Sequence, residues 1–345
     1  MKRNWFFYLV VMVCANLLAT SCSKEDPASG TISVWRDALG TYAPGEFHKL
    51  TVNGEEEISE AKSVLLSSGT GESAKFTLTN IVPDAPTVVI DQVTIIPSEN
   101  RSYTFSGETS LGEITISISG TLTEGEDSNT LELNVTRKVN SPLTGVWKLN
   151  FTQDGSAILF RIESTNEAFN ALMVWLTPKL KEVLARSIKD ITVSLGEDGR
   201  FDLQWTKTGQ DTPIGMPEHI RDMVGIYYFA EDGKLYLAIE KSLLPLLKAL
   251  QPEGIAIDVD ALVDALTEDR GDFVALPILF KQNDNEVEFS LGKNLASLLA
   301  PILIPLVLEH LPADFPESIS QIIEQLPEII NDSQTFDVGL RFNHS

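Results

Sequence analysis

The residue types that most often carry metal, nucleophilic or acid–base chemistry are sparse in this chain. Its four histidines are His48, His219, His310 and His344, and no two of them have the spacing of a metal-binding motif. The sequence has no G-x-S-x-G turn, no phosphate-binding P-loop and no Gly-rich dinucleotide turn. We therefore predict a protein that is not an enzyme and that holds neither a metal ion nor a cofactor.

Acidic residues, in contrast, are abundant: 49 Asp and Glu face 26 Lys and Arg, which gives a formal net charge of −23. This balance argues against nucleic acid as a partner, because a phosphate backbone needs a basic surface. The acidic run at residues 258–272 lacks the Gly and Glu positions of an EF-hand loop, and we interpret it as a solvated helix face. A carboxylate pair for glycoside hydrolysis stays open, because so many acids offer too many pairs.

One basic cluster lies within this acidic chain. The segment PKLKEVLARSIK, residues 178–189, carries Lys179, Lys181 and Arg186. These cations suit contact with an anionic head group, and they also suit pairing with a neighbouring acidic helix. The sequence leaves both uses open.

The N-terminus has the three parts of an export signal. Lys2 and Arg3 precede an apolar run at residues 5–19, and small residues follow before Cys22. The run is shorter than the roughly 20 residues that span a bilayer. We therefore predict a cleaved signal peptide at residues 1–21 and a polar, flexible tether at residues 22–38.

The cleavage region ATSC, which ends at Cys22, resembles the lipobox of bacterial lipoproteins. That resemblance implies cutting immediately before Cys22 and acylation of its thiol and new amino group, which would anchor the protein to a membrane. The following KED resembles the export signal of Bacteroidota surface lipoproteins. It implies a location on the outer membrane, at the cell surface.

Two mainly β segments follow the tether. Residues 39–139 alternate apolar and polar positions in short runs, as half-buried antiparallel strands do. Pro142 marks a linker at residues 140–144, and residues 145–345 repeat the strand pattern with helical insertions. We predict a mainly β fold with α insertions, made of two antiparallel β-barrel domains.

The second segment alternates short turns with long insertions. The short turns TQDGS, GEDGR, EDGK and QNDNE predict hairpins, and their acids Asp154, Asp198, Asp232 and Asp284 would gather at one rim. Four acids at one rim could hold a cation, but turn propensity already explains each of them. In an up-and-down meander the long insertions then meet at the opposite rim. Most insertions have helical periodicity, so we predict that helices cap one end of this barrel.

The cap helices supply more apolar surface than they need to shield one another. Leu243, Leu247, Leu299 and Leu303 represent this surface, and we expect them to line a ligand cavity under the cap. The apolar stretch from Leu295 to Leu308 is interpreted as a buried cap helix, because it is short and contains prolines.

A family resemblance supports the two-barrel prediction. GVW, which ends at Trp147, opens its strand as the G-x-W signature does in lipocalins, and Arg341 lies on the last strand where calycins place a basic residue against that Trp. The resemblance implies that Trp147 and Arg341 meet where the barrel closes. The first segment, with GTY ending at Tyr42 and with Arg137 or Lys138 near its end, resembles calycin-like domains of uncharacterised Bacteroidota lipoproteins.

These observations predict a lipid-anchored outer-membrane protein that binds an apolar or amphipathic small molecule under the helical cap. The alternative is a non-catalytic structural or partner-binding accessory of a cell-surface complex, with solidly filled barrels and protein partners that the sequence does not name. Glycan capture is a third candidate, which needs exposed aromatic platforms. Whether the second barrel is hollow decides between the first two.

Overall fold

The computed structural model of the protein describes most of the chain beyond residue 33. The described ranges are 34–45, 48–68, 73–150, 157–164, 188–215, 225–245, 268–283, 285–294, 296–297 and 326–345, with scattered positions between 167 and 186. The predicted signal peptide and Cys22 lie outside them. The chain divides into two compact units, and both sheets belong to the one that runs from Asp37 to Ser345.

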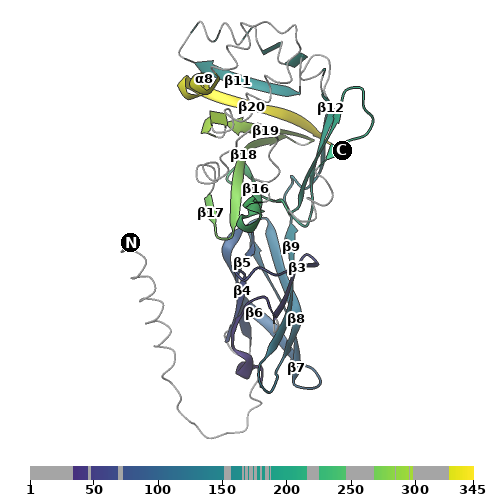
Figure 1. The fold of residues 1–345 in the computed structure, drawn as a ribbon, viewed down its shortest axis with the longest axis vertical. Helices are drawn as coiled ribbons and strands as arrows, with labels where there is room; N and C mark the ends of the chain where they lie inside the picture. Colours follow the sequence, from purple (N-terminus) through teal and green to yellow (C-terminus); the bar gives the residue numbers. More distant parts are fainter. Residues whose placement is uncertain are drawn as a thin grey trace, which may run out of the picture. The chain divides into compact units, whose positions relative to one another are not determined.

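The first sheet contains nine strands in the order β1-β4-β5-β6-β7-β8-β9-β2-β3 (Figure 1). The strands are β1 (Gly40–Tyr42), β2 (His48–Val52), β3 (Glu55–Glu57), β4 (Ser63–Ser68), β5 (Ala74–Val82), β6 (Ala85–Pro97), β7 (Ser102–Leu111), β8 (Ile114–Thr123) and β9 (Thr130–Val139). Neighbours are antiparallel except β2 and β9, which run parallel. The β character predicted for residues 39–139 is therefore confirmed.

Period-two patterning explains how this sheet buries its core. In β9 every second side chain is buried, from Leu131 through Leu133 and Val135 to Arg137 and Val139. The alternation places the guanidinium of Arg137 at a core position, where a charge requires partners.

The long strand β6 folds the first sheet over on itself. Its first part pairs with β5 up to Val93, and its last residues, from Thr94 onward, pair with β7. As a result, Phe76 of β5 and Phe105 of β7 meet with their ring centroids 4.8 Å apart. The core of this part lies between the two halves of one bent sheet.

The second sheet contains eleven strands. The main path has the order β14-β13-β12-β10-β20-β19-β18-β16-β15, with β11 on β20 and β17 on β18. The strands are β10 (Gly145–Asn150), β11 (Ile158–Ser164), β12 (Ile188–Leu195), β13 (Phe201–Lys207), β14 (Ile214–Gly215), β15 (Tyr227–Glu231), β16 (Lys234–Glu240), β17 (Glu268–Arg270), β18 (Phe273–Asn283), β19 (Glu286–Gly292) and β20 (Ser333–His344).

The second sheet curls so that β15, at one end of the strand order, contacts the residues before β13, which is the second strand from the other end. An isolated bridge joins Arg200, just before β13, to Tyr227 at the start of β15. Two backbone hydrogen bonds support that junction: Phe201 N–H donates to Ile226, and Tyr228 N–H donates to Gly199. The strand set therefore forms a curled half-barrel with a concave inner face.

One predicted hairpin is wrong. The turn TQDGS was expected to pair β10 with β11 antiparallel, but both strands are antiparallel to β20 and therefore run in the same direction. β10 pairs with His344 and Asn343, and β11 pairs along β20 from Leu340 to Ser333. The two strands lie end to end on one edge of β20 because β20, at twelve residues, is long enough to pair with both. The other three predicted hairpins, β12–β13, β15–β16 and β18–β19, are present.

Helical structure is limited in the described residues. It comprises the 3-10 helices η1 (Val34–Ala38) and η2 (Lys241–Leu243), the helix α8 (Leu326–Asp332) and helical positions at 244–245, 293–294 and 296–297, and every described position between 167 and 186 is helical. Most of the predicted cap lies outside the described residues, so the cap stays a prediction. Within the stretch from Leu295 to Leu308, residues 296 and 297 are described, and both are helical. No helix among the described residues is long and apolar enough to cross a membrane.

Two buried cations join the first sheet to the second. Arg137 of β9 donates two hydrogen bonds of 2.6 Å to Asp84 and one of 2.8 Å to the carbonyl of Tyr228 on β15. Lys62 pairs with Glu57 at the end of β3 and, at 2.5 Å, with Glu240 at the end of β16. Each buried cation thus has partners in both sheets, which satisfies the requirement that buried charges be paired.

Candidate functional site

The concave face of the second sheet lines a partly open cavity of about 340 Å³. Seven strands contribute its lining, which consists of Ile158, Phe160, Val193, Phe201, Leu235, Ile278, Phe289, Ser290, Leu291, Val338, Gly339, Leu340 and Phe342. This volume lies in the range of about 300–1,000 Å³ that is typical of small-molecule pockets.

Strand alternation explains why the lining is apolar. On β20, Val338, Leu340 and Phe342 face inward, and the residues opposite them on β19 are Leu291, Phe289 and Val287. The intervening positions, Asp337 and Arg341, carry charges and belong to the other face. The sequence pattern of β20 thus separates an apolar interior from a charged exterior.

The charged exterior forms an ion network over the same strands. Glu288 accepts hydrogen bonds from Arg161 on β11 and from Arg341 on β20, both at 2.8 Å. Burial raises the pKa of Glu288, but the hydrogen bonds and charges of the two guanidinium groups outweigh burial and lower this pKa overall. The network therefore holds β11, β20 and β19 together outside the cavity.

Aromatic rings define one part of the cavity. Phe289 and Phe342 meet edge to face with centroids 5.6 Å apart, a favourable arrangement for aromatic pairs. The lining offers almost no hydrogen-bonding surface, since Ser290 is its one polar side chain and is buried. Such a cavity favours hydrocarbon over a polar or charged ligand.

The predicted ligand-lining leucines are not among the residues that line this cavity. Leu243 lies in η2, directly after β16, and is half-buried. Leu247, Leu299 and Leu303 lie outside the described residues. The described lining instead comes from the strands, and its signal in the sequence was the alternation of apolar residues in segments such as AILFRIE and EVEFSL.

The basic cluster is described in part. Arg186 is exposed and donates a hydrogen bond of 2.5 Å to Glu182, four residues earlier. Lys181 is half-buried at a helical position, and Lys179 lies outside the described residues. The partner of Arg186 is therefore an acid of its own segment, whereas the sequence pointed to a head group or a separate acidic helix.

Trp147 and Arg341 lie on strands that pair, but they do not meet. Trp147 is fully buried, donates from Nε1 to the Leu143 carbonyl at 2.7 Å, and lies opposite His344 with ring centroids 4.9 Å apart. Arg341 is three residues from His344, and this odd spacing directs it to the other face, toward Glu288.

The turn acids do not assemble a cation site where they are described. Asp198 accepts the backbone N–H of Arg200 at 3.0 Å, and Asp232 occupies a turn with positive φ. Asp154 and Asp284 lie outside the described residues. Among the residues described, no group of three or more His, Cys, Asp or Glu side chains is placed to hold a metal ion.

Comparisons of this chain with family models, with curated proteins and with solved structures found no match.

Proposed function

We propose that this protein is a lipid-anchored, non-enzymatic binding protein that holds an apolar or amphipathic small molecule inside its second sheet. The observation that carries the proposal is the cavity of about 340 Å³, whose lining is aliphatic and aromatic. Filling the cavity with hydrocarbon would strengthen binding by about 25 cal/mol for each Å² of apolar surface that is removed from water. A fatty acyl chain fits this chemistry, and a charged head group would remain outside.

We further propose that the second sheet forms a complete barrel, which the Arg200–Tyr227 junction closes and helices cap at one end. Closure is supported by the bridge and hydrogen bonds at that junction. The helical positions between 167 and 186 support a cap, because some of them lie beside the second sheet. Val174, Thr177 and Pro178 line a second hollow together with two residues of β11, Phe160 and Ile162.

Native mass spectrometry tests the ligand. Residues 23–345, which include every described residue, would be expressed in bacteria and analysed with bound molecules retained. We expect co-purified fatty acid or phospholipid, and saturable displacement of a fluorescent fatty-acid analogue by palmitate.

A matched pair of variants assigns any binding to the cavity. Ile278→Trp places a larger side chain into the lining, whereas Leu279→Trp changes the next residue of β18, which is exposed on the other face. We expect Ile278→Trp to abolish binding and Leu279→Trp to preserve it. No bound lipid mass and no displacement, or equal effects of the two variants, would overturn the proposal.

The anchor part of the proposal rests on Cys22 and the lipobox-like residues before it. In bacteria fed a labelled fatty acid, the full chain should incorporate the label and fractionate with outer membranes. Cys22→Ser should abolish incorporation, and Cys14→Ser, within the signal segment, should not. Undiminished labelling of Cys22→Ser would contradict the anchor while leaving the cavity proposal intact.

A further inference from the structure

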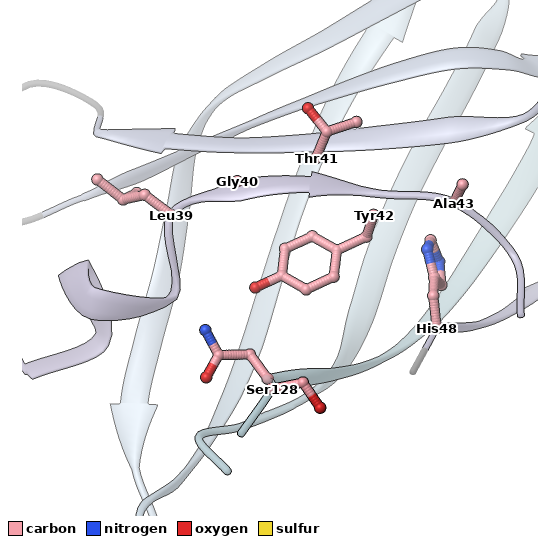
Figure 2. Close-up of a pocket in the computed structure, with 8 residues that line it drawn as sticks. Leu39, Gly40, Thr41, Tyr42, Ala43, His48 and Ser128 are labelled. Atoms are coloured by element: carbon pink, nitrogen blue, oxygen red, sulfur yellow. The ribbon is translucent and has the colours of Figure 1, made fainter. Parts of the chain in front are cut away.

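The first sheet contains a hollow of about 380 Å³ that the proposed lipid function does not use (Figure 2). It lies between β1, the start of β2 and the segment that precedes β9. Its lining consists of Leu39, Gly40, Thr41, Tyr42, Ala43, His48, Ser128 and Asn129.

His48 is the unusual member of this lining. Only 4% of its surface is exposed, and neither ring nitrogen has a hydrogen-bond partner. Its backbone N–H and carbonyl are paired with the backbone of Gly45. Because nearly all buried polar atoms in proteins are paired, two unpaired nitrogens beside a hollow indicate a missing partner.

The hollow is polar but uncharged. The described residues that line it include no Asp, Glu, Lys or Arg. Burial lowers the pKa of His48, which favours the neutral imidazole, and a backbone contact with Tyr42 opposes part of this shift. A neutral imidazole presents one N–H donor and one nitrogen acceptor. Among the described lining residues, an anion would meet no cation, and a metal ion would meet one imidazole and no carboxylate.

Tyr42 supplies a fixed aromatic surface. Its hydroxyl donates to the Ala38 carbonyl at 2.6 Å, and its ring meets His48 edge-on at 6.2 Å between centroids. Figure 2 shows Tyr42 and His48 facing the same hollow, with the Ser128 segment bordering it. The site thus combines an aromatic ring with imidazole, amide and hydroxyl groups.

We propose that this hollow binds a neutral sugar ring, whose hydroxyls pair with His48, Asn129 and Ser128 and whose C–H face packs on Tyr42. Sugar hydroxyls donate and accept hydrogen bonds, so they satisfy both nitrogens of a neutral imidazole. The partly apolar ring face of a sugar suits an aromatic side chain. A lipid chain would leave His48 unpaired.

Imidazole nitrogen NMR tests this site directly, because the chain has only four histidines. Residues 23–345 labelled with ¹⁵N-histidine would be titrated with a panel of neutral hexoses, pentoses and their disaccharides. We expect at least one sugar to shift the His48 ring nitrogens saturably. The His344 signals should stay fixed, because that ring packs on Trp147 in the other sheet. His48→Phe assigns the signals.

Variants separate binding from folding. His48→Phe keeps a buried ring but removes both nitrogens, and Asn129→Ala alters a half-buried residue outside the core. We expect each to weaken sugar binding about tenfold or more, equivalent to about 1.4 kcal/mol. Asn140→Ala, a matched change at an exposed residue bonded to Thr115, should leave affinity unchanged.

Three outcomes would overturn the proposal. One is the absence of a His48 shift with every sugar of the panel, and another is equal affinity in all three variants. The third is a His48 shift caused by Zn²⁺ and by no sugar, which would assign the hollow to a metal ion. None of these outcomes bears on lipid binding in the second sheet.

Discussion

Trp147 of β10 is the largest fully buried side chain among the described residues. It is fully buried, its indole N–H is paired with Leu143, and its ring packs on His344. Trp147→Ala should lower the free energy of unfolding by about 3–5 kcal/mol, as other large truncations in cores do. Urea unfolding followed by circular dichroism measures this change. Arg341→Met, on the opposite face, is the control and should cost less; a larger loss for Arg341→Met would contradict the described faces.

Glu288 makes the second sheet sensitive to acid. Its pKa is lower in the folded protein than its ordinary value of 4.5, so its contribution to stability is fully present above that value. The contribution is lost as the pH falls through the depressed folded pKa. Glu288→Gln should therefore be less stable than the parent at pH 7, and the gap should close in acid. Urea midpoints across a pH series test this sign, with the exposed Glu197→Gln as a control that leaves the gap near zero.

His48 shows what residue-scale sequence reading missed. The sequence predicts no metal site at any of the four histidines, because such a site needs several ligands at suitable spacing. A single histidine can instead mark a site when its nitrogens are buried without partners, and that condition depends on neighbours far away in sequence. The burial of His48 was readable from the alternation of HKLTV, but the empty space beside it was not.

At the scale of elements, Gly120 controls how closely β8 approaches β9. A Cβ at this position would collide with the carbonyl oxygen of Glu132 and with the ring of Phe105. Gly120→Ala should therefore destabilise the first sheet by about 1–3 kcal/mol, the range for overpacking in a core. Thermal unfolding measures the loss. Gly40→Ala, where a Cβ meets nothing within 4 Å, should be nearly neutral, and equal losses would contradict the close approach.

The positions of the strands were easier to predict from the sequence than the way in which the strands pair. Period-two alternation located the segments that became β10, β13, β18 and β20, because burial of one face imposes that pattern. Pairing was less accessible: TQDGS has hairpin composition, yet β10 and β11 share one edge of β20. A turn sequence specifies local backbone geometry, whereas the choice of a strand partner depends on the length of β20 and on the curl of the whole sheet.

At the scale of the whole molecule, Arg137 connects the two sheets through Asp84 and the Tyr228 carbonyl. Arg137→Ala would leave Asp84 buried without its cation, at a cost of about 3–5 kcal/mol. The parent should unfold in a single transition by both fluorescence and circular dichroism, and the variant should show two separated transitions. Lys138→Ala removes the neighbouring, exposed pair with Glu197 and should cost about 1 kcal/mol or less. A single unshifted transition in Arg137→Ala would contradict this role.

The parallel pairing of β2 with β9 determines the order of events during folding. β2 pairs with a strand 83 residues further along the chain, as the contact between Thr51 and Asn134 shows, whereas β5 to β9 join through successive hairpins. Contacts between distant residues form slowly because a long loop must close first. On the ribosome, β2 leaves the exit tunnel long before its partner exists, so His48 reaches its place only after β9 has folded. Pulse-labelling hydrogen exchange should find β2 amides protected last, and the hollow beside His48 would be the last part of the first sheet to gain the capacity to bind.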